Sequence, residues 1–404
     1  MRISTNQFQI LGVNAILDQQ AKVSKTQLQL STGRRLLQPS DDPVAATRVL
    51  SLTEALTQGE QFQKNIIYAE SRLGITEGKI DGVINLLQRV REMALQANSG
   101  FLSTTDRDNI SQEIRERAAE LLGLANSTNV NGEYIFAGFQ GQTQPFSQTA
   151  AGTFNYAGDE GQRFLQISEN RQIAVTESGT DVFRQIRNGN GTFTTNYNTA
   201  NSGSGVIDPG SVNGSFISDT YTITFSQPTP TSPITYGVTG ATSGVVVAPG
   251  TAYVDGADIL FNGVRTNVTG TPANGDSFTV VPSTNQDMFT TVENFVSALA
   301  IGTTTSNGAA ASNNQINRVI IDLDRALDNV VKTQARVGAR QNAIANQKSL
   351  NDEQILDTRE VLSDTQDLDI AEAASRLSRQ LVSLQAAQQV FIKVQNLSLF
   401  NFLS

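Results

Sequence analysis

Apolar residues recur every seven positions along a stretch near the N-terminus. The seam consists of Ile66, Leu73, Ile80, Leu87 and Ala94. Most of the apolar positions between them are filled by Phe62, Ala69, Val83, Val90 and Ala97. A seven-residue repeat is typical of long helices that pack side by side. The pattern therefore predicts one long helix, and a second helix after the stop at Gly100 and the N-cap signal Ser103–Asp106.

A second helical arm lies toward the C-terminus. Its seam consists of Ile316, Leu323, Val330, Val337 and Ile344, and another amphipathic run follows the Asp-rich break at 364–369. Such seams suit either subunit interfaces or the interior of an intramolecular bundle. Because the apolar seams of a single chain can bury one another, we favour the intramolecular bundle.

The segment before the first long helix carries strong boundary signals. Gly33 is expected to end a preceding helix, and Pro39-Ser40-Asp41-Asp42-Pro43 follows it. The adjacent Asp41 and Asp42 could form a catalytic carboxylate pair. We favour capping, because Ser40 or Asp42 would cap a helix whose first turn tolerates Pro43. This segment is predicted to be a corner between two helices.

The middle of the chain, residues 141–310, is rich in Gly, Thr, Ser and Val and reads as a β region. Strands are predicted at Phe154–Gly158, Tyr221–Phe225, Tyr236–Val238, Ile259–Phe261 and Ser277–Val281. The expected class is α+β: a long antiparallel helical bundle formed by the two arms, with a β-rich domain inserted between them. We predict a terminal helical domain (1–42 with 366–404), a helical rod domain with β-hairpins (43–185 with 276–365) and an outer β-rich domain (186–275).

Both terminal segments carry apolar stripes on Gln- and Asn-rich helices. One helix pair buries only part of such a surface, so the remainder is expected to contact other subunits; a purely intrachain hairpin is the alternative. The predicted subunit-interface residues are Ile3, Phe8, Ile10, Leu11, Ile16, Leu17, Leu377, Leu381, Leu384, Phe391, Val394, Leu397 and Phe400.

Composition narrows the function. The chain has no His, Cys or Trp, so thiolate nucleophiles, Ser-His triads and the usual zinc and haem ligand sets are excluded. The net charge of −9 disfavours a nucleic-acid partner. Residues 141–310 hold 12 Asp and Glu against 5 Arg, which suits a solvated outer surface. Carboxylates such as Asp255, Asp258 and Asp276 could form the acid pair of a glycosidase. We favour the simpler interpretation that they are scattered surface acids. Asp208 is also expected to be exposed. We expect no catalytic residue, no metal and no cofactor.

Targeting signals point away from the general secretory route. Residues 1–20 have neither a basic region nor an apolar core typical of a secretory signal peptide. No apolar run approaches the roughly 18–20 residues that span a bilayer, so no membrane insertion is expected.

Several segments together resemble one family. They are LSTGRRLLQPSDDPVAATRVLSL (30–52), REMALQANSG (91–100), TTDRDNISQEI (104–114), NGEYIFAGFQGQTQPF (131–146) and the Leu-Gln-Ala-Ala-rich C-terminal arm. They resemble the flagellin and hook-associated protein superfamily and cover both helical arms. The two prolines around Ser40-Asp41-Asp42 and the start Met1-Arg2-Ile3-Ser4 are more similar to the hook–filament junction branch than to flagellin.

The resemblance implies a structural protein of the bacterial flagellum. It would be exported unfolded by the flagellar type III apparatus, kept soluble by an export chaperone, and assembled as a ring with copies of itself. Hook-associated protein 1 would lie on one side of the ring and flagellin on the other. The terminal helices would form an inner tube, and the β insertion would face outward. A filament flagellin is the alternative, followed by an adhesin.

Overall fold

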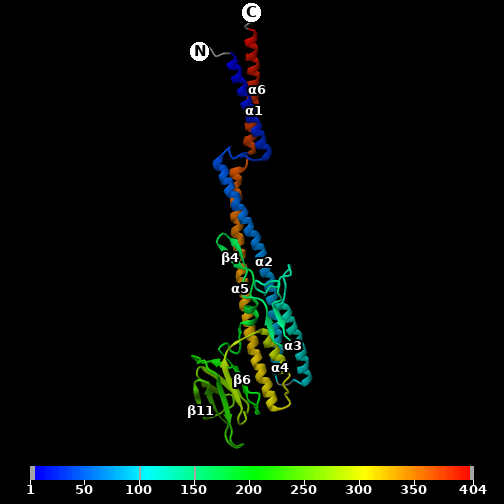
Figure 1. The fold of residues 1–404 in the computed structure, drawn as a ribbon, viewed down its shortest axis with the longest axis vertical. Coiled ribbons are helices and arrows are strands. Elements are labelled where there is room, and N and C mark those ends of the chain that lie inside the picture. Colours follow the sequence, from blue (N-terminus) through cyan, green and yellow to red (C-terminus); the bar gives the residue numbers. More distant parts are fainter. Residues whose placement is uncertain (1–4, 100–101, 150–151, 401–404) are drawn as a thin grey trace. The chain divides into compact units, whose positions relative to one another are not determined.

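The computed structural model describes residues 5–99, 102–149 and 152–400, without the side chains of residues 5, 6, 8 and 394–400. Long helices precede and follow a strand-rich middle, which confirms the α+β class (Figure 1). The chain divides into two compact units: unit 1 consists of residues 1–64 and 347–404, and unit 2 of residues 65–346. The finer division into three domains stays a prediction.

Unit 1 contains an antiparallel pair of terminal helices. Helix α1 (Thr5–Thr32) lies beside helix α6 (Ile370–Phe400), as Figure 1 shows. The unit also holds the beginning of α2 (Pro43–Ala97) and the end of α5 (Ser306–Gln366). The predicted break after α5 is confirmed, because Asp369 Oδ1 accepts a hydrogen bond from Glu372 N at 3.0 Å where α6 begins.

The corner between α1 and α2 follows the sequence signals. Helix α1 ends directly before Gly33, whose φ of 68° is in the left-handed region that glycine adopts without strain. Asp42 Oδ1 accepts a hydrogen bond from Ala45 N at 3.0 Å, and Pro43 is the first residue of α2. Capping by Asp42 is therefore confirmed.

The heptad seams meet inside unit 2. Every predicted seam residue of α2 and α5 is fully buried in one core, so the intramolecular bundle is confirmed. Two further helices pack on this core: α3 (Thr104–Ala125) and α4 (Met288–Leu299). The predicted cap of α3 is present as a reciprocal pair of hydrogen bonds between Ser103 and Asp106.

Helix α4 corrects the prediction that residues 141–310 are uniformly β. Its apolar residues Met288, Phe289, Val292, Phe295 and Val296 recur at helical spacing. Asp287 caps the helix, since its Oδ1 accepts a hydrogen bond from Thr290 N at 2.7 Å. This helix was not predicted because twelve residues next to a β region change the local composition very little.

Short two-stranded antiparallel pairs lie against the helical core of unit 2. Antiparallel pairs form between β1 and β2, between β3 and β4, and between β5 and β15. A π-helical turn, η1 (Thr180–Arg184), places Phe183 in an aromatic cluster with Phe136, Phe146 and Phe289. The strands are β1 (Phe146–Gln148), β2 (Phe154–Tyr156), β3 (Phe164–Ser168), β4 (Arg171–Ala174), β5 (Ile186–Arg187) and β15 (Asn285–Gln286).

The remaining strands form a body with its own core, here called the β domain. A five-stranded antiparallel sheet has the order β11-β10-β9-β14-β6, and β13 pairs with β12, β7 and β8. Aromatic and β-branched side chains from both groups of strands share one buried cluster, separate from the helical core. Four of the five predicted strands lie in this domain and are confirmed, and the fifth, predicted at 154–158, is the shorter β2. The domain comprises β6 (Phe193–Tyr197), β7 (Val206–Ile207), β8 (Ser211–Val212), β9 (Tyr221–Ser226), β10 (Thr235–Gly240), β11 (Gly244–Ala252), β12 (Asp258–Phe261), β13 (Val264–Thr269) and β14 (Ser277–Pro282).

The β domain is attached to α5 by buried polar contacts. Asp322 Oδ1 accepts a hydrogen bond from Gly189 N at 2.7 Å, and Asn314 Oδ1 accepts one from Ile207 N at 2.9 Å. The chain enters and leaves the domain at one place, because Asn188 N donates to Thr284 O at 3.0 Å. These two strand ends therefore delimit a separable insertion.

Candidate functional site: the surface of unit 1

The α1–α6 pair places the predicted interface residues in three groups. Ile16, Leu377, Leu384 and Phe391 are half-buried within the pair. Ile10, Leu11, Leu17 and Leu381 are exposed. The other five predicted residues lie outside the described part of the chain, either entirely (Ile3) or by their side chains (Phe8, Val394, Leu397 and Phe400). The predicted stripe thus serves both the intrachain pair and an open surface, and its role between subunits stays a prediction.

A glycine brings the two terminal helices close together. A Cβ atom at Gly12 would lie 2.8 Å from Cδ2 of Phe391, so the phenyl ring packs directly on the α1 backbone. Polar contacts also cross the pair: Gln19 Nε2 donates to Gln380 O at 3.2 Å. Arg376 Nη2 donates to Gln29 Oε1 at 3.3 Å. The pair therefore has a defined register.

Exposed apolar side chains are concentrated on unit 1. Among the described residues, 26 large apolar side chains are exposed, and 14 of them belong to unit 1, which holds fewer than a third of all residues. A surface of this kind is typical of a protein that packs against other chains. Unit 1 is therefore the candidate assembly surface.

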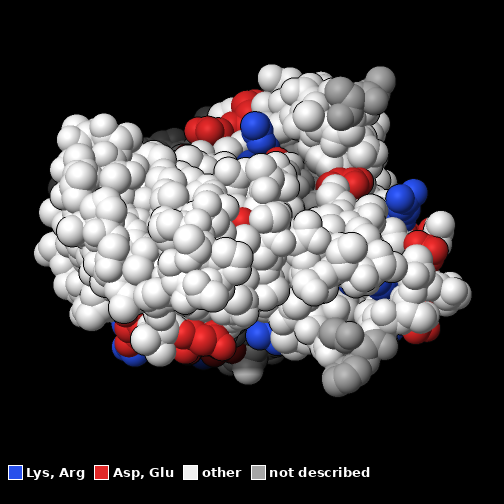
Figure 2. Space-filling model, turned by 90° about the horizontal axis from the view of Figure 1, so that it is seen from below, with Lys and Arg blue, Asp and Glu red and all other residues white. Residues whose placement is uncertain are grey.

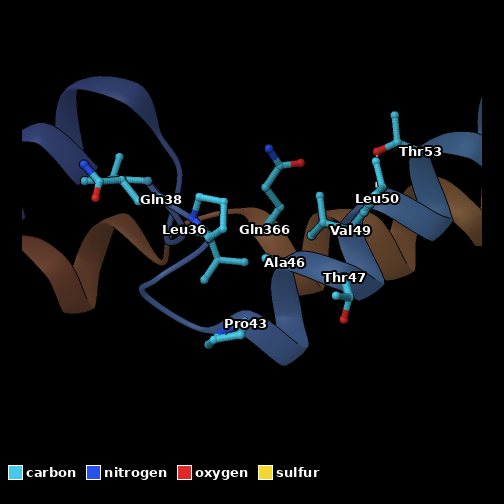
Figure 3. Close-up of a pocket in the computed structure, with 11 residues that line it drawn as sticks. Leu36, Gln38, Pro43, Ala46, Thr47, Val49, Leu50, Thr53 and Gln366 are labelled. Atoms are coloured by element: carbon cyan, nitrogen blue, oxygen red, sulfur yellow. Dashed lines mark hydrogen bonds between the residues drawn. The ribbon is translucent and has the colours of Figure 1, made fainter.

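The corner of unit 1 also contains an apolar pocket, which the sequence did not predict. It has a volume of about 540 Å³ and lies between the loop after α1, the first turns of α2 and the end of α5 (Figure 3). Asp41 shapes the loop, since its Oδ2 accepts hydrogen bonds from Leu37 N and Gln38 N and its Oδ1 pairs with Lys25. The lining residues are Leu36, Leu37, Gln38, Pro39, Pro43, Ala46, Thr47, Val49, Leu50, Thr53 and Gln366.

A sequence signal for this pocket does exist. Ala46, Val49, Leu50 and Thr53 have the i, i+3, i+4, i+7 spacing of one helix face. The spacing gives no information on whether that face is covered. In the structure Leu50 is 62% exposed, so the face is open.

Acidic residues of the β domain accept hydrogen bonds from loops or pair with a basic side chain. Asp276 is buried and accepts hydrogen bonds from Ser202 N, Gly203 N and Ala273 N. It is therefore not the surface acid that we expected. Asp258 pairs with Arg265 at 2.9 Å.

Two further aspartates also accept hydrogen bonds from neighbouring segments of the β domain. Asp208 is half-buried rather than exposed, because its carboxylate accepts hydrogen bonds from Thr266 and Asn267. Asp219 accepts backbone N–H groups of Ser243, Thr242 and Thr220, and these bonds lower its pKa to about 2. Residues 220–254 contain no charged residue, and the surface of the β domain in Figure 2 is mostly uncharged. The excess negative charge of residues 141–310 therefore lies outside the stretch 220–254.

Two fully or nearly fully buried carboxylates fasten surface segments to α5. Glu177 contacts Arg340 at 2.6 Å and Arg336 at 3.6 Å, and burial raises its pKa despite these cations. Burial also raises the pKa of Asp322, which binds Gly189 N.

Among the described residues no cluster of Asp and Glu has the arrangement of a metal site. No helix in the described part of the chain is long and apolar enough to cross a bilayer.

Comparisons with known proteins agree on one family. Residues 3–141 match the family model of the bacterial flagellin N-terminal helical region. Flagellar hook-associated protein 3 of Escherichia coli is 25% identical over 404 residues, 99% of each chain. The same protein of Salmonella typhimurium is 33% identical over 186 residues, 46% of this chain and 58% of that relative.

Solved structures of related proteins have a similar fold. The crystal structure of flagellar hook-associated protein 3 from Legionella pneumophila is 32% identical, with a TM-score of 0.76 over 78% of this chain and 98% of that chain. Salmonella flagellins match only a third of this chain. The chain therefore belongs to the flagellar hook-associated protein 3 family of the flagellin superfamily.

Proposed function

We propose that the protein is a structural junction component of the bacterial flagellum. It would form a ring with copies of itself, between hook-associated protein 1 and the flagellin filament. Family membership supports the place in the flagellum. The concentration of exposed apolar side chains on unit 1 is the observation that carries the assembly role, because covering apolar surface with other chains removes it from water and favours association.

The structure also supports a mechanical division of labour. The buried α2–α5 seams give unit 2 a continuous core that does not depend on neighbouring subunits. The β domain has its own core and is anchored to α5 at Asn314 and Asp322. We infer that unit 1 makes the contacts along the flagellar axis, while unit 2 provides stiffness and an outer surface.

Export would use the flagellar type III apparatus together with an export chaperone. The absence of cysteine fits a chain that crosses a narrow channel unfolded, because no disulfide can trap a folded form. A filament flagellin remains the competing function.

Electron microscopy of flagella from a deletion strain tests the junction role. Loss of a junction protein leaves bare hooks while flagellin is released into the medium, and the restored gene returns the filaments. Loss of a filament protein removes that flagellin itself. If the purified chain polymerises alone into long filaments, the junction role is wrong and the flagellin role is correct.

A further inference from the structure

The pocket in the corner of unit 1 is an apolar groove with an uncharged lining. None of its eleven lining residues is charged, and Leu50 projects from the open face of α2 with 62% of its surface exposed. The spacing of Ala46, Val49, Leu50 and Thr53 presents a ridge along one helix face (Figure 3). Such a ridge beside a loop suits an added amphipathic helix, which would insert its own apolar side chains between those of α2.

Charge is divided unevenly within unit 1. The segments that contain the terminal helices, 1–32 and 370–404, hold six Lys and Arg against two Asp and Glu, a net charge of +4. The segments that include the pocket lining, 33–64 and 347–369, hold six basic residues against eleven acidic ones, a net charge of −5. Opposite charges on two partners steer them together, over about 10 Å at 0.1 M salt.

We propose that this pocket binds the apolar, basic end of a terminal helix from an adjoining flagellin-type subunit. The occupant has the chemistry of α6 in this chain, which is rich in Leu, Val and Phe and carries Arg379 and Lys393 beyond its first turns. The pocket supplies apolar area for the helix face, and the acidic residues of 352–369 attract the basic groups. This inference rests on the proposed function and names a partner surface for it.

A peptide of residues 378–404 serves as the probe, because it contains both basic residues and no acidic residue. Binding of the labelled peptide to the full-length chain is measured by fluorescence anisotropy, with a scrambled peptide of equal composition as the control. The protein variants are Leu50→Asp and Leu50→Lys. Val130→Asp is the matched control, since Val130 is 91% exposed and lies in unit 2.

Apolar docking predicts that both Leu50 variants weaken binding by about tenfold or more, because each places a charge in a contact that should be dry. Val130→Asp should leave the affinity unchanged, and added salt should weaken binding to the unaltered chain. If Leu50→Asp tightens binding while Leu50→Lys weakens it, attraction is only electrostatic and the pocket is not the site. Equal affinity for all variants, or for the scrambled peptide, also overturns the proposal.

The failure of this inference is separable from failure of the junction role. Circular dichroism and thermal unfolding of the Leu50 variants show whether the fold is intact. A strain with Leu50→Lys reports on the flagellum. If the peptide does not bind the unaltered chain and the strain still attaches filaments, the pocket proposal is wrong while the junction role stands.

Discussion

Replacing Gly12 by alanine would add a methyl group where Phe391 now packs. The new Cβ would lie 2.8 Å from Cδ2 and 3.1 Å from Cε2 of that ring. Carbon atoms in ordinary contact are about 3.5–4.0 Å apart. Because the Phe391 ring of α6 packs against the backbone of α1, either the ring must rotate or the two helices must move apart. The substitution therefore tests whether the α1–α6 register depends on this contact.

The magnitude follows from two opposing terms. Alanine favours a helix over glycine by about 0.8–1.0 kcal/mol. Overpacking at a close contact costs about 1–3 kcal/mol. Gly12→Ala should therefore destabilise the pair by up to about 2 kcal/mol. Gly78→Ala on α2 is the control, because nothing lies within 4 Å of a Cβ at Gly78 and only the favourable propensity acts.

Native-state amide exchange measures the opening of α1 and α6 directly. Gly12→Ala should increase exchange in both helices, and Gly78→Ala should not. In a Phe391→Leu background, where the ring is removed, Gly12→Ala should lose its destabilising effect. If Gly12→Ala slows exchange as much as helix propensity alone would, the close packing of Phe391 on Gly12 does not limit this pair.

Three further predictions concern assembly, pH and the outer domain. Leu384→Asp or Phe391→Asp should block filament attachment at a cost of several kcal/mol in a dry contact, with the β domain still folded by near-UV circular dichroism. Hydrogen bonds from Arg163, Asn129 and Arg72 lower the pKa of Glu133 to about 2 from an ordinary value of 4.5. Its stabilisation is therefore complete above pH 4.5 and is lost as the pH falls toward 2, so Glu133→Gln should cost about 1–2 kcal/mol at pH 7 and little at pH 2 in denaturant unfolding. Deleting residues 190–282 behind a short Gly/Ser linker should preserve secretion and filament attachment in a swimming assay.

Each of these predictions has a result that contradicts it. Full-length filaments on a strain with Phe391→Asp would show that the C-terminal stripe makes no essential contact between subunits. A constant effect of Glu133→Gln from pH 7 to pH 2 would show that the carboxylate charge is not what stabilises this turn. The deletion must include β14, because that strand pairs with β6 and β9 and would otherwise lose both partners. A deleted chain that is stable and secreted but leaves bare hooks would assign axial contacts to the β domain.

The helical arms were predictable from the sequence because their signals are local and repeated. Seven-residue spacing recurs over several turns from Ile66 to Ala94, and each repeat reports the same buried face. The corner at Gly33 and Pro43 was predictable for a related reason, since capping and left-handed backbone depend on neighbouring residues. Helix α4 was not predicted because a single short amphipathic stretch lacks that repetition.

Tertiary structure decided which acids and apolar faces remain available. Asp208 and Asp276 look like surface acids in the sequence, but distant backbone N–H groups and side chains occupy their carboxylates. The face of α2 at Val49 and Leu50 has the same spacing as the buried seam, yet it lines an open pocket. Periodicity identifies a face that can be buried, whereas burial itself depends on which distant segment lies against it. The sequence alone therefore determined the helical arms and the family resemblance, and the three-dimensional packing determined which apolar faces and carboxylates stay accessible.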